Sequence, residues 1–481
     1  MKPQTLDQIG AAVGGTVRDA EGTEVVTSIV VDSREASAGA LFVALPGERV
    51  DGHQFAAAAR EKGASGALVR RGWQGTGPAI EVDDPATALL ELGRTERENL
   101  RATVVGITGS TGKTLTKDLT AAVLSERYAV VASQASFNNE VGLPLTILSA
   151  TEATEALVCE MGSRGPGHIR LLCEVARPHV GVVTNVGVAH MELFGSTDVL
   201  RDAKAELPEA LPVDGTAVLN ADDDLVRSYA GRTRARTVLF GMSPDAQVRA
   251  ADVTVSRQTG AASFELITPG GSAQVKLALP GEHIVPDALA AAAVGWRLGV
   301  DVEKVAHGLT HAVVSTGRMH VIRATGFRVI DDSYNANPTS MAAALKALRW
   351  MAGTSRCVAV LGVMAELGPI ADEEHERIGE LAARLGIDEL VVVGREARLL
   401  AVGAKREGVE PDRIHMCDDV SQAIERLAQV VQAGDLVLVK ASRVARLERV
   451  VEALQSVRLE HESSPGDLDG VPAARAKGEP S

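Results

Sequence analysis

Apolar residues in this chain fall into short runs, and segments with helical periodicity separate them. Between residues 99 and 313 we expect strands at 103–107, 156–160, 180–185 and 215–220. Strands that are apolar throughout and alternate with helices are typical of a parallel sheet covered on both faces. A segment of alternating polar and apolar residues follows at 251–279, which indicates antiparallel strands joined at the Thr-Pro-Gly-Gly turn 268–271. A predicted helix at about 286–298 closes this region.

The same kind of pattern defines two flanking bodies. Residues 1–98 contain short β-rich pieces around a predicted helix at 54–62, which indicates a small mixed α/β domain. Beyond residue 313 we expect strands at 328–332, 357–362, 390–394, 413–417 and 436–440. Helical segments between these strands predict a Rossmann-like, doubly wound domain. The predicted fold class is therefore α/β with three domains, at 1–98, 99–313 and 314–459, followed by a polar, disordered tail at 460–481.

Composition narrows the classes of function. A chain of 481 residues is too long for one core, which agrees with several domains. The formal charge of −14 argues against a nucleic-acid partner, because phosphate backbones favour basic surfaces. No apolar run approaches the roughly 20 residues of a membrane span, and the N-terminus leads into no signal-peptide core. We therefore expect a cytoplasmic protein, and a monomer.

The segment 104–114, Val-Val-Gly-Ile-Thr-Gly-Ser-Thr-Gly-Lys-Thr, carries the first chemistry. Glycines let the backbone curl with its N–H groups inward, and the helix that follows adds its positive N-terminal end. We expect this loop to bind the phosphates of ATP in the central P-loop domain, through Thr108, Gly109, Ser110, Thr111 and Gly112. Lys113 can neutralise a phosphate oxygen, and the Thr114 hydroxyl can hold Mg²⁺. The glycines lie at 106, 109 and 112, so the spacing differs from the common G-x-x-x-x-G-K-S/T pattern.

Three further side chains fall where strands of this sheet end or where a helix returns to that edge. Glu160 ends a strand beside the loop, where a carboxylate can hold Mg²⁺. His190 follows another strand, and Lys204 lies on a later helix. Each also has a simpler interpretation: a surface glutamate, a packed histidine, and a lysine in a weak helix-surface ion pair.

In this order and spacing these residues resemble the ATP-dependent Mur ligases, over residues from about 25 to 455. The resemblance implies that CO₂ carbamylates Lys204 and that two Mg²⁺ ions bind, held by Thr114 and Glu160 and by His190 with the carbamate. It assigns catalytic roles to Lys113, His190, Lys204 and Arg318. Arg318 is expected at the γ-phosphate and Asp332 at the ribose of ATP.

The segment Asp331-Asp-Ser-Tyr-Asn-Ala-Asn-Pro338 resembles the motif of one branch of that family. That branch joins D-alanyl-D-alanine to UDP-N-acetylmuramoyl-tripeptide through an acyl phosphate, in peptidoglycan precursor synthesis. The N-terminal region similarly looks like a UDP-sugar domain. The resemblance implies substrate contacts by Ser33, Arg34, Asn138, Asn139, Asn335 and Asn337.

Three departures from the family pattern and three alternatives stay open. Asp287 stands where an asparagine usually reads adenine, and an aspartate can accept a hydrogen bond there but cannot donate one; Val363 and Ala441 also differ from the common residues. The chain could instead add diaminopimelate or lysine, or extend folate with glutamate. It could also be a nucleotide-binding regulatory protein without turnover. The Asp331–Pro338 motif and the intact Lys113, Glu160, His190 and Lys204 argue against these alternatives.

Overall fold

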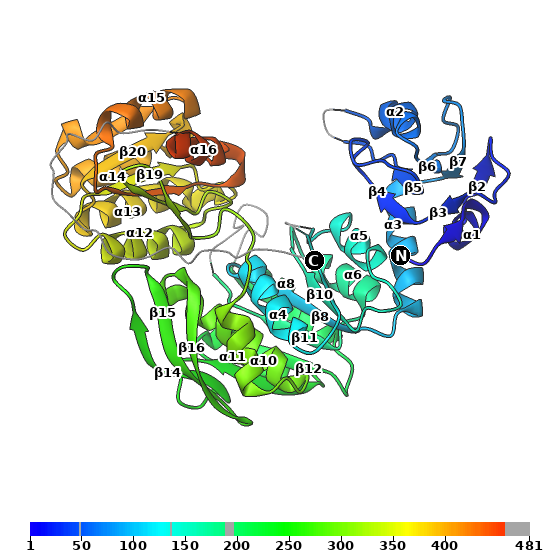
Figure 1. The fold of residues 1–481 in the computed structure, drawn as a ribbon, viewed down its shortest axis with the longest axis horizontal. Coiled ribbons are helices and arrows are strands. Elements are labelled where there is room, and N and C mark those ends of the chain that lie inside the picture. The colour runs from blue at the N-terminus through cyan, green and yellow to red at the C-terminus, as the bar shows by residue number, and fades with distance from the viewer. Residues whose placement is uncertain (48–49, 135–136, 188–196, 457–481) are drawn as a thin grey trace, which may run out of the picture.

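A computed structural model describes residues 1–47, 50–134, 137–187 and 197–456. It shows three α/β bodies in chain order, and the two smaller bodies lie apart from each other beside the central one (Figure 1). The expected α/β fold class with parallel-sheet domains is confirmed. Within the described residues, no helix is long and apolar enough to cross a membrane.

The N-terminal body is built on the sheet β2-β7-β6-β5-β4, in which only the β2–β7 pair is antiparallel. Its elements are β1 (Gln4–Thr5), α1 (Leu6–Ala12), β2 (Thr16–Arg18), β3 (Val25–Val26), β4 (Ser28–Val30), β5 (Ala40–Val43), η1 (Gly52–Phe55), α2 (Ala56–Glu61), β6 (Gly66–Arg70), β7 (Ala79–Val82) and α3 (Pro85–Asn99). The helix expected at 54–62 is α2 with the η1 turn before it. Helices α1 and α3 were not predicted, although Asp84 caps α3 and Pro85 begins it, which is a recognisable start signal.

The central body contains residues 108–114, the predicted phosphate-binding loop, which is called the phosphate-binding loop from here on. Its elements are β8 (Thr103–Thr108), α4 (Lys113–Ser125), β9 (Val130–Ala132), α5 (Gly142–Leu148), β10 (Ala156–Glu160), α6 (His168–Ala176), β11 (Val180–Val183), α8 (Thr197–Ala210), β12 (Thr216–Asn220), α9 (Asp224–Ser228), η2 (Tyr229–Gly231), β13 (Arg236–Gly241), β14 (Val248–Val255), β15 (Ala261–Thr268), β16 (Gly271–Pro280), η3 (Glu282–Ile284), α10 (Val285–Arg297) and α11 (Val302–Thr310). The strand order is β16-β15-β14-β13-β12-β11-β8-β10-β9. From β14 to β9 in this order, β8 included, neighbouring strands pair in parallel. Strands β15 and β16 extend the sheet with antiparallel pairing. Because β8 lies between β10 and β11, the residues that follow these three strands meet at one edge.

The C-terminal body has the sheet order β17-β18-β22-β19-β20-β21. Its elements are β17 (His320–Arg323), β18 (Arg328–Asp331), α12 (Pro338–Ala352), β19 (Cys357–Gly362), η4 (Gly368–Ile370), α13 (Ala371–Arg384), β20 (Glu389–Val393), η5 (Arg395–Ala397), α14 (Leu399–Arg406), η6 (Pro411–Arg413), β21 (Ile414–Cys417), α15 (Val420–Val430), β22 (Leu436–Lys440), η7 (Arg443–Ala445) and α16 (Glu448–Ser456). The five predicted strands are present and parallel. The unpredicted β17 is an antiparallel edge strand without a fully buried face, so it carries a weak hydrophobic signal.

The central and C-terminal bodies are in contact. A continuous cluster of buried apolar side chains extends from β8 and α10 into α12 and β19. At the tip between β14 and β15, the Gln258 carbonyl accepts a hydrogen bond from Arg328 at 2.8 Å, and Arg257 lies over the Trp350 ring at 5.0 Å. These contacts set the phosphate-binding loop opposite the start of α12.

Candidate active site

The phosphate-binding loop is shaped by its glycines and held by its neighbours. Gly112 has φ of +79° and precedes α4, so its backbone adopts a conformation that a side chain would strain. Asn185, just after β11, accepts a hydrogen bond from the Thr111 amide at 2.9 Å through its side-chain oxygen. Thr184 donates to the Thr111 carbonyl at 2.6 Å. The sheet edge therefore fixes the loop from the side, a role that the sequence pattern did not assign.

Lys113 lies within the loop rather than pointing into solvent. Its Nζ donates to the carbonyls of Gly109 at 2.9 Å and Ser110 at 3.4 Å. Burial lowers the pKa of Lys113, whereas the nearby Glu160 carboxylate opposes that shift. A phosphate oxygen offers this ammonium a stronger acceptor than a carbonyl does, so the lysine is placed to bind the phosphates of a nucleotide.

Glu160 ends β10 with its carboxylate buried beside the loop. Asn138 donates to Oε1 at 2.8 Å, and Oε2 has no hydrogen-bond partner among the described residues. A buried carboxylate oxygen without a donor suits a cation. No cluster of three metal-ligating side chains occurs in the described ranges. Mg²⁺ usually binds one or two protein oxygens together with substrate phosphates and water, so Glu160 and Thr114 fit such an ion.

Lys204 lies on α8 and is completely buried. Its Nζ has no hydrogen-bond partner within the described part of the chain. Burial, followed by the positive charge of Lys113, lowers the pKa of Lys204 well below its usual value. This shift favours the neutral amine over the ammonium form relative to an exposed lysine, and a neutral amine is nucleophilic.

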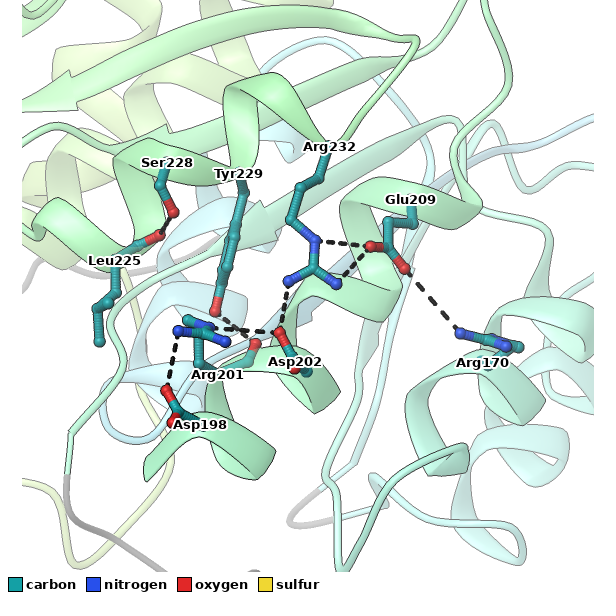
Figure 2. A network of polar contacts seen from close by, with 9 residues as sticks. All are labelled: Arg170, Asp198, Arg201, Asp202, Glu209, Leu225, Ser228, Tyr229 and Arg232. Carbon is teal, nitrogen blue, oxygen red and sulfur yellow. Dashed lines mark hydrogen bonds and ion pairs between the residues drawn. The ribbon is translucent and has the colours of Figure 1, made fainter. Parts of the chain in front are cut away.

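A network of partly exposed charged side chains lies along α8 (Figure 2). Arg232, next to the buried Tyr229, bridges two carboxylates of the helix, at 2.6 Å from Asp202 and 2.6 Å from Glu209. The Tyr229 hydroxyl donates to the Arg201 carbonyl at 2.6 Å. These contacts tie α8 to the segment after β12 and so position the helix that carries Lys204.

The C-terminal body supplies the facing wall of the site. Arg318 donates through Nη2 to the Thr114 hydroxyl at 3.1 Å, and its guanidinium carbon lies 4.3 Å from the centre of the Tyr334 ring. Asp332, in contrast, is buried, and both of its carboxylate oxygens already accept hydrogen bonds. Lys440 donates to one at 2.5 Å and the Met319 amide to the other at 3.3 Å. Asp332 thus organises the turn that carries Arg318.

Asp287, in the first turn of α10, lies directly behind the loop. It accepts a hydrogen bond from Thr116 at 3.0 Å, and a Cβ added to Gly112 would come within 2.2 Å of its Oδ1. Burial raises the pKa of Asp287 to about 7, and Thr116 and Arg318 only partly offset this. Near neutral pH the side chain therefore exchanges a proton, and in its protonated form it can donate a hydrogen bond.

A cavity of about 380 Å³ lies between the phosphate-binding loop and the C-terminal body, and its lining does not include Thr108, Lys204, Asp287 or Asp332. Many of the expected site residues line it: Ser110, Thr111, Gly112, Lys113, Thr114, Asn138, Asn139, Glu160, Arg318, Asn335 and Asn337. Asn139 and Asn337 also have local roles, since they accept hydrogen bonds at the starts of α5 and α12. Arg164, His168, Tyr334, Glu366 and Arg443 line the cavity too and had no predicted role.

Other expected residues lie elsewhere. Ser33 and Arg34 belong to the N-terminal body and are not part of this cavity. Arg34 hydrogen-bonds Asp32, at 2.6 Å for the shortest contact, and this lowers the pKa of Asp32 to about 2. His190 lies outside the described residues.

Comparison with known proteins agrees with this geometry. Residues 25–95 match the model of the Mur ligase family catalytic domain, residues 107–295 the Mur ligase middle domain, and residues 317–443 the Mur ligase glutamate ligase domain. The chain therefore belongs to the Mur ligase family, and it is an ATP-dependent ligase.

Relatives within this family are more specific. The UDP-N-acetylmuramoyl-tripeptide–D-alanyl-D-alanine ligase of Mycobacterium tuberculosis H37Rv is 43% identical, over 94% of this chain and 97% of that protein. The ligase of the same name from Escherichia coli K12 is 36% identical, over 94% and 98%. A crystal structure of MurF from Acinetobacter baumannii is similar with a TM-score of 0.85 at 31% identity, covering 95% of this chain and all of that one. MurF from Thermotoga maritima, solved in complex with ADP, has a TM-score of 0.77 at 31% identity, over 89% and 97%.

Proposed function

We propose that this chain joins D-alanyl-D-alanine to UDP-N-acetylmuramoyl-tripeptide at the expense of ATP, a step in making peptidoglycan precursors. Similarity over nearly the whole chain to ligases of that name supports the proposal. The structural observation that most directly supports this function is the 3.1 Å hydrogen bond from Arg318 to Thr114. It joins the C-terminal body to the phosphate-binding loop at one cavity. Structures of a diaminopimelate ligase and of folylpolyglutamate synthase are 19% and 17% identical, and they share the fold alone.

Amide formation from a carboxylate and an amine needs activation. The γ-phosphoryl group of ATP passes to the terminal carboxylate of the tripeptide and gives an acyl phosphate. The amine of the dipeptide attacks the acyl carbon, loses a proton, and phosphate leaves. Negative charge lies on phosphoryl oxygens during transfer, so stabilisation is electrostatic and positional. Lys113 and Arg318, at the loop and opposite it, meet that need.

Residues beside the phosphate-binding loop would hold the expected Mg²⁺, together with His190, which lies outside the described residues. Thr114 and Glu160 would bind one ion, and His190 with a carbamate on Lys204 a second. Bound there, Mg²⁺ would neutralise phosphate charge. Glu160 Oε2, buried without a donor among the described residues, is the observation that favours this assignment.

The chemistry of the Lys204 amine supports a carbamate at this position. A neutral amine adds to CO₂ and releases one proton, which changes the side chain from a potential cation to an anion. Burial and the charge of Lys113 lower the pKa of the amine and so favour its neutral form, and an anion in this place would be attracted to Lys113 and to a divalent ion. A bare amine without a partner would gain neither interaction.

The remaining assignments extend the same proposal. Thr108 to Gly112 bind phosphate, and Asp287 and Asp332 contribute to the adenosine end. Asn138, Asn139, Asn335 and Asn337 contact the peptide substrates, and Ser33 and Arg34 the UDP-sugar part. The domain limits 1–98, 99–313 and 314–459, a monomeric state and a cytoplasmic location stay predictions.

Phosphate release tests the function directly. The purified chain is assayed with ATP against a panel of UDP-muramyl peptides and D-amino dipeptides. We expect turnover only when UDP-N-acetylmuramoyl-tripeptide and D-alanyl-D-alanine are both present. Preference for a single amino acid as acceptor would contradict the proposal, and so would the absence of turnover with any pair.

A further inference from the structure

A small side cavity of about 170 Å³ adjoins the main one. The phosphate-binding loop forms one wall with Ser110 and Lys113, and the C-terminal body forms the other with Glu366, Ser442 and Arg443. A ligand here lies next to the phosphoryl group that Lys113 would hold. The position therefore suits the second substrate of the ligase rather than the nucleotide.

The backbone that carries Arg443 is firmly placed. Ser442, between β22 and η7, donates its amide to the Val363 carbonyl at 2.9 Å. Its hydroxyl accepts from the Ala365 amide at 2.9 Å and donates to the Ala336 carbonyl at 3.1 Å. Three segments of the C-terminal body are thereby joined at the base of the Arg443 side chain.

The guanidinium of Arg443 still has donors available. Its ion pair with Glu448 is long, at 3.5 Å, and its side chain is 63% exposed. Its guanidinium carbon lies 5.6 Å from the centre of the Tyr334 ring, the same ring that Arg318 contacts at 4.3 Å. The Tyr334 ring therefore contacts two arginines. Arg318 donates a hydrogen bond to Thr114 at the phosphate-binding loop, and Arg443 does not.

The acceptor dipeptide requires a site with this chemistry. Its amine must approach the acyl phosphate, and its other end is a carboxylate that needs a counterion. Lys113 and Arg318 are engaged at the phosphate-binding loop, and Arg164 and His168 lie on the central-domain side of the main cavity. The planar fork of an arginine matches a carboxylate with two parallel hydrogen bonds.

We propose that Arg443, supported by Tyr334, binds the terminal carboxylate of the acceptor dipeptide and makes a free carboxylate a requirement for the acceptor. This inference rests on the proposed function and adds a specificity-determining residue to it. Loss of the guanidinium should weaken use of the dipeptide without changing the binding of ATP or of the UDP-linked substrate.

The test compares two acceptors, D-alanyl-D-alanine and D-alanyl-D-alaninamide, which lacks the negative charge. For the unmodified protein we expect kcat/KM to be about 30-fold or more lower with the amide. Arg443→Met should lower kcat/KM for the acid by a similar factor and bring the two acceptors close to equality. Arg443→Lys, which keeps the charge but not the fork, should recover part of the preference. KM for ATP and for UDP-N-acetylmuramoyl-tripeptide should not change in either variant.

Arg449→Met serves as the matched control, because Arg449 is also exposed, lies on α16 and does not line either cavity. It should keep the full preference for the acid. An Arg443→Met enzyme that retains this preference would overturn the inference while leaving the proposed function intact. Equal use of the acid and the amide by the unmodified protein would overturn it as well. No turnover of D-alanyl-D-alanine by the unmodified protein would instead reject the proposed function, and the inference with it.

Discussion

Lys204 and Asp287 are two buried titratable side chains close to the phosphate-binding loop, and burial shifts their pKa values in opposite directions. The pKa of the Lys204 amine is lowered, which favours its neutral form, and the pKa of the Asp287 carboxyl is raised to about 7. In both cases desolvation disfavours the charged form. Each shift leads to a measurable consequence.

If a carbamate at this position supports catalysis, Lys204→Ala should lower the ligase rate by about 100-fold or more. Short carboxylic acids, added to the assay, should restore part of the rate because they can supply the missing oxygens. The measurement is phosphate release with both substrates, with and without acetate or formate. Full activity of the unrescued variant would exclude a catalytic role for the carbamate.

Asp287 should make stability depend on pH. The unfolded chain loses this proton at about pH 3.9, whereas the folded protein keeps it to about pH 7. Between these values the folded state binds more protons, so its contribution to the free energy of unfolding falls as pH rises and is lowest above pH 7. Asp287→Asn should therefore gain stability relative to the unmodified protein, by about 1–2 kcal/mol more at pH 8.5 than at pH 5.5.

Denaturant unfolding at the two pH values measures this difference. Asp301→Asn, at the exposed start of α11, is the control and should show no such dependence. A difference for Asp287→Asn that is the same at both pH values would contradict a raised pKa.

Helix α8 illustrates what a single element contributes. It carries the buried Lys204 and the partly exposed charged network of Figure 2. Exposed ion pairs stabilise proteins by only about 0–1 kcal/mol, so the network matters more for the position of the helix than for overall stability.

Arg232→Ala removes the bridge from Arg232 to both Asp202 and Glu209. We expect a loss of about 1 kcal/mol or less in the free energy of unfolding but a several-fold lower kcat, because Lys204 is then less firmly positioned. Thermal unfolding and steady-state rates measure the two effects separately. Arg234→Ala, an exposed change two residues away, should leave both unchanged, and an unaltered kcat in Arg232→Ala would show that the network does not position Lys204.

For the whole molecule, three bodies suit a reaction in which ATP, a carboxylate and an amine meet away from water. We expect the bodies to close when substrates bind. Small-angle scattering should show a smaller radius of gyration with a nucleotide analogue and UDP-N-acetylmuramoyl-tripeptide than for the protein alone. Identical scattering curves in the two states would contradict closure.

Several features could be predicted from the sequence because they depend on local pattern. The buried strands β8, β10, β19 and β22 are continuous apolar runs, and the glycine loop follows a strand and precedes a helix. Helix α1 and strand β17 were missed because short or half-exposed elements have weak periodicity. Helix α3 was missed although its start signal and the helical spacing of Ala88, Leu89 and Leu92 are present in the sequence. The position of Asp332 at the ribose stays a prediction, and no local pattern could reveal that its carboxylate also accepts from Lys440, 108 residues further along the chain.

By itself, then, the sequence determined the α/β class, the phosphate-binding loop and the residues that resemble a ligase, because each depends on spacing along the chain. Only the tertiary structure decided which of them share a site. It joined Arg318 to Thr114 across two domains and left Lys204 without a partner among the described residues. It also placed Arg443 beside Tyr334. The physical reason is that burial, charge pairing and pKa depend on neighbours that the fold assembles from distant segments, and one chain's linear pattern does not contain those distances.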